Sequence, residues 1–284
     1  MYYRKFCLHY SHLKENKAFE KISRKIEDHY GNSLIFKLGT SWSELLQQQR
    51  KWNVALPNPQ LKFWKHYIVP YLQQNKKIFV IISDALRYEI AAELMSIIRQ
   101  EDRFEAELSA MSGTLPSITS IGMAALLPHE TISFDGKNNV LVDGLSSSGT
   151  ENRMKIMNKY HSDRSIALRA EDVIKMSTEN ARNIYRNYDV IYVYHNAIDA
   201  IGDKLATEEK VFEAVETAMN ELLTLVRKMS SANANNIIIT ADHGFLYQRD
   251  ELSEDQYLDD KIKLNENDLK LRRCIIGREL AKNL

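Results

Sequence analysis

Three short apolar runs rich in β-branched residues constrain the fold of this chain more than any other feature. They cover residues 78–82, 189–194 and 236–240. Continuous rather than alternating hydrophobicity is typical of strands buried on both faces, as in a parallel sheet. Between them, residues 86–98 and 211–225 carry apolar side chains at three- and four-residue spacing, which predicts helices. Strands that alternate with helices predict an α/β protein with a mostly parallel central sheet flanked by helices.

Other segments of this region carry weaker patterns. Residues 104–111 are compatible with a further strand, and residues 119–127 predict a helix that Pro128 closes. Residues 137–152 are rich in Gly, Ser and Asn and predict a loop or an insertion.

The first 75 residues differ from the rest of the chain. They hold all three tryptophans, are rich in Lys, Glu and Gln, and predict mostly helix. The Ser41-Trp-Ser-Glu44 sequence resembles a capping box that opens a helix through Leu45 and Leu46. We therefore expect a helical lead-in segment over residues 1–75 and an α/β core over residues 76–284.

The composition excludes several classes of protein. Lys and Arg total 38 and balance 38 Asp and Glu, so there is no bulk positive charge for nucleic acid. No apolar run approaches the roughly 20 residues of a membrane-spanning helix, and the start lacks the apolar region of a signal peptide. Two distant cysteines do not make a disulfide scaffold. We expect a cytoplasmic location and no membrane association.

Polar side chains follow all three predicted buried strands. They are Asp84 after the first, His195, Asp199 and Asp203 after the second, and Asp242 and His243 after the third. In open α/β sheets, ligands bind outside the carboxyl ends of the strands. Carboxylates combined with histidine suit zinc, manganese or a similar divalent ion. The pattern therefore predicts a metal site at this edge of the sheet.

Each part of this pattern has a simpler alternative. Asp84 alone is explained equally well as the N-cap of the next helix. Asp199 and Asp203 are four residues apart and share a face on a helical turn, but they are also typical of solvated loop charges. Adjacent Asp242 and His243 at the end of a buried strand are unusual without a function. The joint occurrence at three strand ends favours the metal site.

A candidate nucleophile lies in residues 115–123. A hydroxyl residue at this loop-to-helix junction, Ser117 or Thr119, is near free N–H groups of the helix that attract phosphate. A nearby metal ion can also lower the pKa of such a hydroxyl. The alternative is that Ser117 or Thr119 merely caps the helix.

Five sequence blocks in a fixed order carry a resemblance to a known family. The blocks are Ile81-Ile-Ser-Asp-Ala-Leu-Arg-Tyr-Glu89, Leu115-Pro-Ser-Ile-Thr119 with Gly122–His129, Val142–Asn152, Tyr194-His-Asn-Ala-Ile-Asp199 and Thr240-Ala-Asp-His-Gly-Phe245. The chain resembles the PglZ family of bacterial BREX phage-defence systems, within the alkaline phosphatase superfamily. The resemblance covers roughly residues 76–280 and implies an alkaline-phosphatase-like fold.

The resemblance also implies a set of metal ligands and a nucleophile. Asp84, Asp242 and His243 match the ligands of one metal ion, and Thr119 matches the nucleophile that bridges to it. Two ions are implied in the complete domain, with zinc as the first expectation and manganese as the second.

Two departures from the superfamily pattern concern the second ion. Asp199 and Asp203 match its Asp-x-x-x-His ligands, but Asp203 replaces the histidine, which favours a harder ion such as manganese. The superfamily supplies a further histidine after Asp-His-Gly, whereas no histidine follows His243 here. We therefore expect a core that is truncated at its C-terminus.

Three neighbouring residues are further candidates. Arg87 either clamps a phosphate oxygen or forms a salt bridge with a neighbour on its helix. His195 and Asn196 either orient Asp199 or contact the substrate.

The resemblance implies a metal-dependent phosphatase or phosphodiesterase with a two-metal mechanism. Thr119 attacks phosphorus to give a phosphothreonine, which a metal-bound hydroxide then hydrolyses. Other BREX proteins are the implied partners, and nucleic acid or a nucleotide is a substrate suggested by the defence context. The alternatives are a non-catalytic scaffold of the BREX assembly with a vestigial metal site, and a sugar-phosphate mutase. The mutase is disfavoured because the chain has no insertion that resembles the substrate domain of the mutases.

Overall fold

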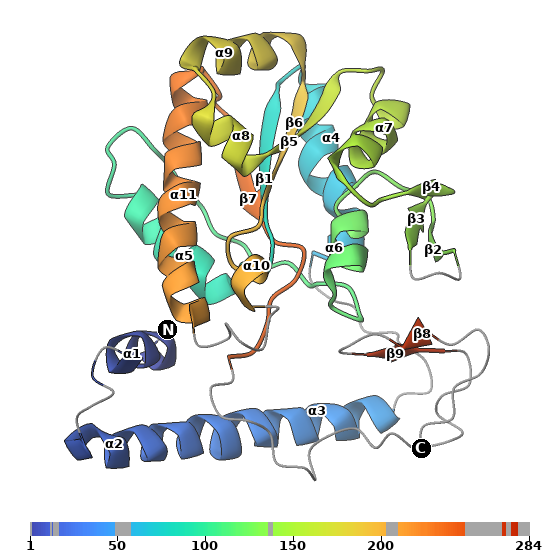
Figure 1. Cartoon of the computed structure of the whole chain (residues 1–284). Coiled ribbons are helices and arrows are strands. Elements are labelled where there is room, and N and C mark those ends of the chain that lie inside the picture. The colour runs from blue at the N-terminus through green and yellow to red at the C-terminus, as the bar shows by residue number, and fades with distance from the viewer. Residues whose placement is uncertain are drawn as a thin grey trace.

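The centre of the molecule is a parallel sheet of four strands (Figure 1). The computed structural model describes residues 2–11, 13, 17–48, 58–135, 139–202, 210–247, 269–270 and 274–277. The strands lie in the order β5 (Ser165–Arg169), β6 (Val190–His195), β1 (Ile78–Ser83) and β7 (Ile237–Thr240), and every pair is parallel. The predicted α/β class with a parallel central sheet is confirmed.

Helices cover both faces of this sheet because side chains alternate along β1, the fully buried strand. Phe79 and Ile81 belong to one apolar cluster, and Ile78, Val80 and Ile82 belong to another. The first face carries α5 (Tyr88–Ile98), α8 (Ala170–Lys175), α9 (Thr178–Asn187) and α11 (Val211–Ser231) (Figure 1). The other face carries the helices η2 (Gln60–Lys62), η3 (Trp64–Ile68), α4 (Val69–Gln73), α6 (Thr119–Ala125) and α7 (Thr150–Tyr160). The short helix α10 (Asp199–Gly202) follows β6.

The structure differs from the expected loop or strand in two linking segments. Residues 104–111 form neither strand nor helix, although their side chains alternate between half-buried and exposed over residues 104–108. The segment has no partner strand, and the neighbouring pairing is an isolated bridge between Pro59 and Ser112. Residues 137–152 are not a plain loop: they contain two strands of a small antiparallel sheet and the start of α7.

Small antiparallel sheets complete the set of described strands. One contains β2 (Ile132–Phe134), β3 (Val140–Val142) and β4 (Leu145–Ser146), and the other contains β8 (Leu269–Lys270) and β9 (Ile275–Ile276).

The expected N-terminal helical segment is present. It consists of α1 (Tyr2–Ser11) and of a long run in which α2 (Lys17–Asp28), η1 (His29–Ile35) and α3 (Phe36–Gln48) follow one another without a break. The sequence Ser41–Glu44 lies inside α3, so the predicted capping box is wrong. The boundary at residue 75 stays a prediction. Among the described residues, no helix has both the length and the apolar character needed to cross a membrane.

Helix α1 is attached to the sheet layer by a buried arginine. Arg4 is 1% exposed and pairs with Glu93 of α5 and with Glu216 of α11, both at 2.5 Å. Cys7 of the same helix belongs to the apolar cluster on the first face. By contrast, α3 has no buried residue.

Candidate metal centre

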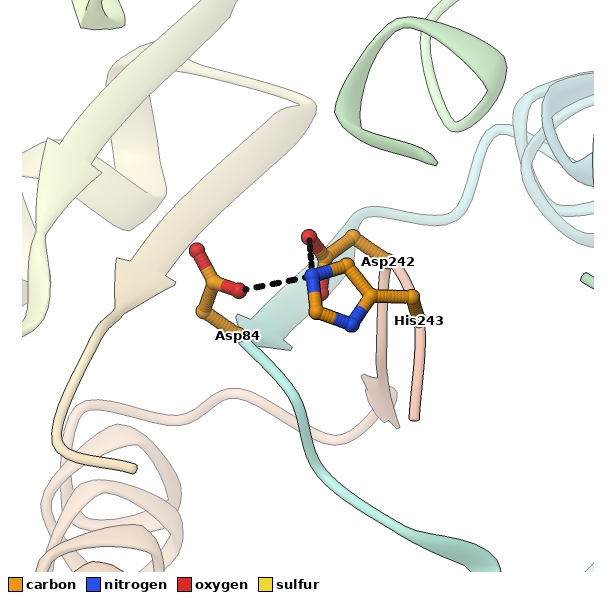
Figure 2. A group of neighbouring side chains, drawn as sticks. All are labelled: Asp84, Asp242 and His243. Carbon is orange, nitrogen blue, oxygen red and sulfur yellow. Dashed lines mark ion pairs between the residues drawn. The ribbon is translucent and has the colours of Figure 1, made fainter. Parts of the chain in front are cut away.

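Three side chains from two strand ends meet at the carboxyl edge of the sheet (Figure 2). Asp84 follows β1, and Asp242 and His243 follow β7, so the parallel pairing of the two strands brings them to one edge. His243 Nε2 lies 3.6 Å from Asp84 Oδ1 and 3.5 Å from Asp242 Oδ2. All three residues are buried, and their possible ligand atoms lie within 4.8 Å of one another. The structure therefore brings together three of the residues predicted from the sequence.

The hydrogen bonds of His243 fix which ring nitrogen faces the carboxylates. Its Nδ1 lies 2.9 Å from the carbonyl oxygen of Gly244, which can only accept, so Nδ1–H is the donor. In the neutral ring, Nε2 is therefore an acceptor, and the Thr119 hydroxyl donates to it at 2.9 Å. A backbone carbonyl that fixes the tautomer in this way is typical of metal-binding histidines.

Without a cation, the charged form of the two buried carboxyl groups is unfavourable in free energy. Burial raises the pKa of Asp84 to about 8, with further contributions from the charges of Asp242 and Asp199. Burial also raises the pKa of Asp242 to about 6, although a hydrogen bond from the Ala85 N–H at 3.1 Å opposes this shift. Within the described chain, Asp84 Oδ1 and Asp242 Oδ2 are buried and have no hydrogen-bond partner. These two oxygens and the imidazole nitrogen form a ligand set that fits a divalent ion.

Neither capping alternative is observed in this region. The N-cap residue of α5 is Arg87 rather than Asp84, and the N-cap residue of α6 is Ile118 rather than Ser117 or Thr119. Thr119 is instead the first residue of α6, and its hydroxyl faces His243.

The other predicted residues after β6 are placed differently from one another. Asp199 begins α10 and lies near enough to Asp84 for its charge to raise the Asp84 pKa. Asp203 lies outside the described residues. Asn196 is exposed, with no contact that defines a role.

His195 connects elements rather than facing the three-residue cluster. Its Nδ1 lies 2.9 Å from Ser83 Oγ, and its Nε2 lies 2.9 Å from Glu221 Oε2 of α11. Burial lowers the pKa of His195, and Glu221 opposes that shift. The side chain thus links the ends of β1 and β6 to α11.

Arg87 lies beside the turn that follows His243. Its guanidinium group is 4.2 Å from the ring centre of Tyr247 and 5.5 Å from that of Phe245. Its Nε is 3.7 Å from Glu89 Oε1, which is the helix-neighbour pairing considered as an alternative. The phosphate-clamping role of Arg87 stays a prediction.

Sequence reasoning missed Gln60, which is 1% exposed next to the cluster. Its side-chain amide donates to the carbonyl oxygen of Asp242 at 2.6 Å and to that of Ala241 at 3.2 Å. Gln60 and Asp242 are 182 residues apart, and no local pattern in the sequence connects them.

Comparisons with known proteins agree with this architecture. A sequence model of the family described as the BREX system PglZ alkaline phosphatase-like domain matches residues 63–284. The "Alkaline phosphatase-like protein PglZ" of Bacillus cereus (strain H3081.97) is 38% identical over 282 residues, which cover 98% of this chain and 32% of that protein. The "Alkaline phosphatase-like protein BrxZ" of Escherichia coli O9:H4 (strain HS) is 39% identical over 277 residues, with coverages of 95% and 32%.

The chain thus spans about a third of the length of these curated relatives. The match to the family model covers well over half of the chain and includes every described residue of the metal cluster. On these grounds, the chain belongs to the PglZ family of alkaline phosphatase-like domains.

Proposed function

We propose that this chain is a metal-dependent phosphoester hydrolase, a phosphatase or phosphodiesterase, of a BREX phage-defence system. One observation carries the proposal: the Thr119 hydroxyl lies 2.9 Å from His243 Nε2, beside two buried carboxylates that have oxygens without partners among the described residues. A hydroxyl nucleophile next to a cation-binding set is an arrangement that supports phosphoryl transfer through a covalent intermediate.

In this proposal, Asp84, Asp242 and His243 hold a divalent ion, zinc or manganese. When bound, the ion supplies positive charge that polarises a phosphoryl oxygen and lowers the pKa of a nearby hydroxyl. Thr119 is the nucleophile: its hydroxyl loses its proton, its oxygen forms a bond to phosphorus, and the bond from phosphorus to the leaving oxygen breaks as that oxygen takes up a proton. Water then hydrolyses the phosphothreonine, which releases phosphate or a phosphomonoester and regenerates the Thr119 hydroxyl. Asp199 and Asp203 are proposed to hold the second ion of the complete domain.

The relatives suggest the setting of this activity. The family description names the BREX system, so we propose other BREX proteins as partners. We also propose a cytoplasmic location and nucleic acid or a nucleotide as substrate. We propose that residues 1–75 form a helical lead-in to the catalytic core.

The test is turnover of p-nitrophenyl phosphate and of bis-p-nitrophenyl phosphate by the chain with zinc or manganese. Thr119→Ala should lower turnover by at least about 1,000-fold without loss of the fold, because the nucleophile is removed. Ser120→Ala is the matched control, since Ser120 is the next hydroxyl residue of α6 and is exposed. Turnover by Thr119→Ala at the wild-type rate would contradict the assignment of the nucleophile.

The non-catalytic alternative predicts a different result. A vestigial centre would bind metal, and Asp242→Ala would abolish that binding, but neither substrate would be hydrolysed. Metal-dependent hydrolysis of either ester that is lost in Thr119→Ala would exclude the scaffold function.

A further inference from the structure

We propose that Gln60 is a positioning residue for the candidate metal centre: it holds the main chain of Asp242 and thereby places Asp242 and His243. The inference rests on the proposed function of that centre. It concerns a residue that precedes the matched family region, which begins at residue 63.

Gln60 holds the chain where the sheet no longer does. Strand β7 ends at Thr240, and β1 is its one partner in the described sheet, so the backbone after Thr240 has left the strand ladder. The Gln60 amide donates to the next two carbonyl groups, those of Ala241 and Asp242, at 3.2 and 2.6 Å. Buried carbonyl groups need such partners, and here one side chain supplies both.

The other end of the same side chain holds the segment that leads to Thr119. Gln60 Oε1 accepts hydrogen bonds from the Thr114 N–H at 3.0 Å and from its hydroxyl at 3.3 Å. The backbone N–H of Gln60 also donates to the Ser112 carbonyl at 2.9 Å. Gln60 therefore joins the ligand loop to the nucleophile segment. Only an amide of this length offers a donor to one and an acceptor to the other.

The Asp242 carbonyl is confined from a second direction by α6. A Cβ atom at Gly122 would lie 2.3 Å from that carbonyl oxygen. The oxygen thus sits between the amide of Gln60 and the backbone of the helix that carries Thr119. Loss of the Gln60 hydrogen bonds would leave the carbonyl groups of Ala241 and Asp242 without this side-chain donor.

The first measurement is metal affinity, by calorimetric titration of the full chain with zinc and with manganese. Gln60→Leu, which removes both donor and acceptor, should weaken binding by about 10- to 100-fold, as for other residues that orient metal ligands. The matched control is Asn236→Leu. Asn236 Nδ2 donates to the Lys77 carbonyl at 3.0 Å. These two residues directly precede β7 and β1, so they lie at the ends of the strands away from the candidate metal centre. The control should lower stability but leave affinity within about threefold of the wild type.

A second readout does not depend on metal. The Ala85 N–H donates to Asp242 Oδ1, so its hydrogen exchange reports whether the Asp242 carboxylate is in place. In metal-free protein, Gln60→Leu should speed this exchange by at least about tenfold, whereas Asn236→Leu should not. Gln60→Met keeps the length of the side chain but has no N–H donor, so it should reproduce the effect if Gln60→Leu fails to fold.

The outcomes separate the two proposals. Absence of metal binding by the wild type would overturn the proposed metal centre, and the Ala85 exchange would then decide the role of Gln60 by itself. Wild-type exchange at Ala85 in folded Gln60 variants would overturn the positioning role, whatever the metal affinity of the wild type.

Discussion

At the scale of single residues, the candidate centre contains two buried carboxyl groups whose charged form is unfavourable without a cation. Asp84 and Asp242 are 4% and 1% exposed, and each has a carboxylate oxygen without a partner among the described residues. Burial of an unpaired carboxylate is costly, so in metal-free protein the group takes up a proton instead. The same burial strengthens the attraction for a divalent cation.

The raised pKa values of these two carboxyl groups predict how the stability of the protein depends on pH in the presence of a chelator. The folded-state pKa values of Asp84 (about 8) and Asp242 (about 6) lie above the ordinary value of 3.8. Their contribution to the free energy of unfolding is therefore complete below about pH 4 and is lost as the pH rises to about 8, because the unfolded chain releases these protons more readily. The melting temperature of the wild type should fall more steeply between pH 5 and pH 8 than that of Asp84→Asn.

The Asp84→Asn variant is compared with the wild type. Asp84→Asn should be the more stable protein at pH 8 without metal and should bind zinc more weakly than the wild type. Equal slopes for the two proteins in thermal denaturation would contradict the assignment of the raised pKa values.

The sequence was sufficient to find the three candidate ligands but not Gln60, which we propose to position two of them. Asp84, Asp242 and His243 were predictable because parallel strands place their carboxyl ends together. Gln60 was not, because its contacts depend on how the segment before β1 folds back across the sheet edge. His195 resembled a site residue in the sequence, and only the structure shows its partners Ser83 and Glu221.

At the scale of elements, the packing of α6 against the ligand loop is close enough to require glycine. Gly122→Ala should push the Asp242 backbone away and destabilise the protein by about 1–3 kcal/mol, as overpacking does. Gly39→Ala in α3 is the control, since nothing lies within 4 Å of the added Cβ atom. That change should stabilise the protein by about 0.5–1 kcal/mol.

Urea denaturation measures both changes, and metal titration measures the effect on the centre. Zinc affinity should fall in Gly122→Ala and stay unchanged in Gly39→Ala. A Gly122→Ala protein with wild-type stability and affinity would show that the close approach is not required.

The elements differ in how visible they are in the sequence. Strands β1, β6 and β7 were predictable from their continuous apolar runs, which reflect burial on both faces in β1 and β6, whereas β7 is half-buried at the edge of the sheet. Strand β5 was not, because Ser165 and Arg169 at its ends leave an apolar run of only Ile166–Leu168. Residues 104–111 carry the alternation of a strand, but a strand also needs a partner, which one segment of sequence does not reveal.

At the scale of the whole molecule, the ion pairs of the buried Arg4 attach the N-terminal helix to the sheet layer. Arg4→Ala would leave Glu93 and Glu216 without this partner and should cost about 2–4 kcal/mol in the free energy of unfolding. Arg24→Ala is the matched control: Arg24 also pairs with a glutamate at 2.5 Å, but it is 78% exposed. The control should change stability little, because exposed pairs contribute little.

Urea denaturation of the two variants checks this contrast. Equal losses of stability in Arg4→Ala and Arg24→Ala would mean that α1 is not held by its buried arginine.

The strand order also has a consequence for the making of the protein on the ribosome. Strand β1, whose six residues are all buried, pairs with β6 and β7, which lie roughly 100 residues or more downstream. At about 5–20 residues per second, β1 waits roughly 5–20 s for its first partner. The most apolar strand is therefore the one that stays longest without a neighbour during translation. During this interval its exposed apolar side chains and unpaired edges are prone to aggregation.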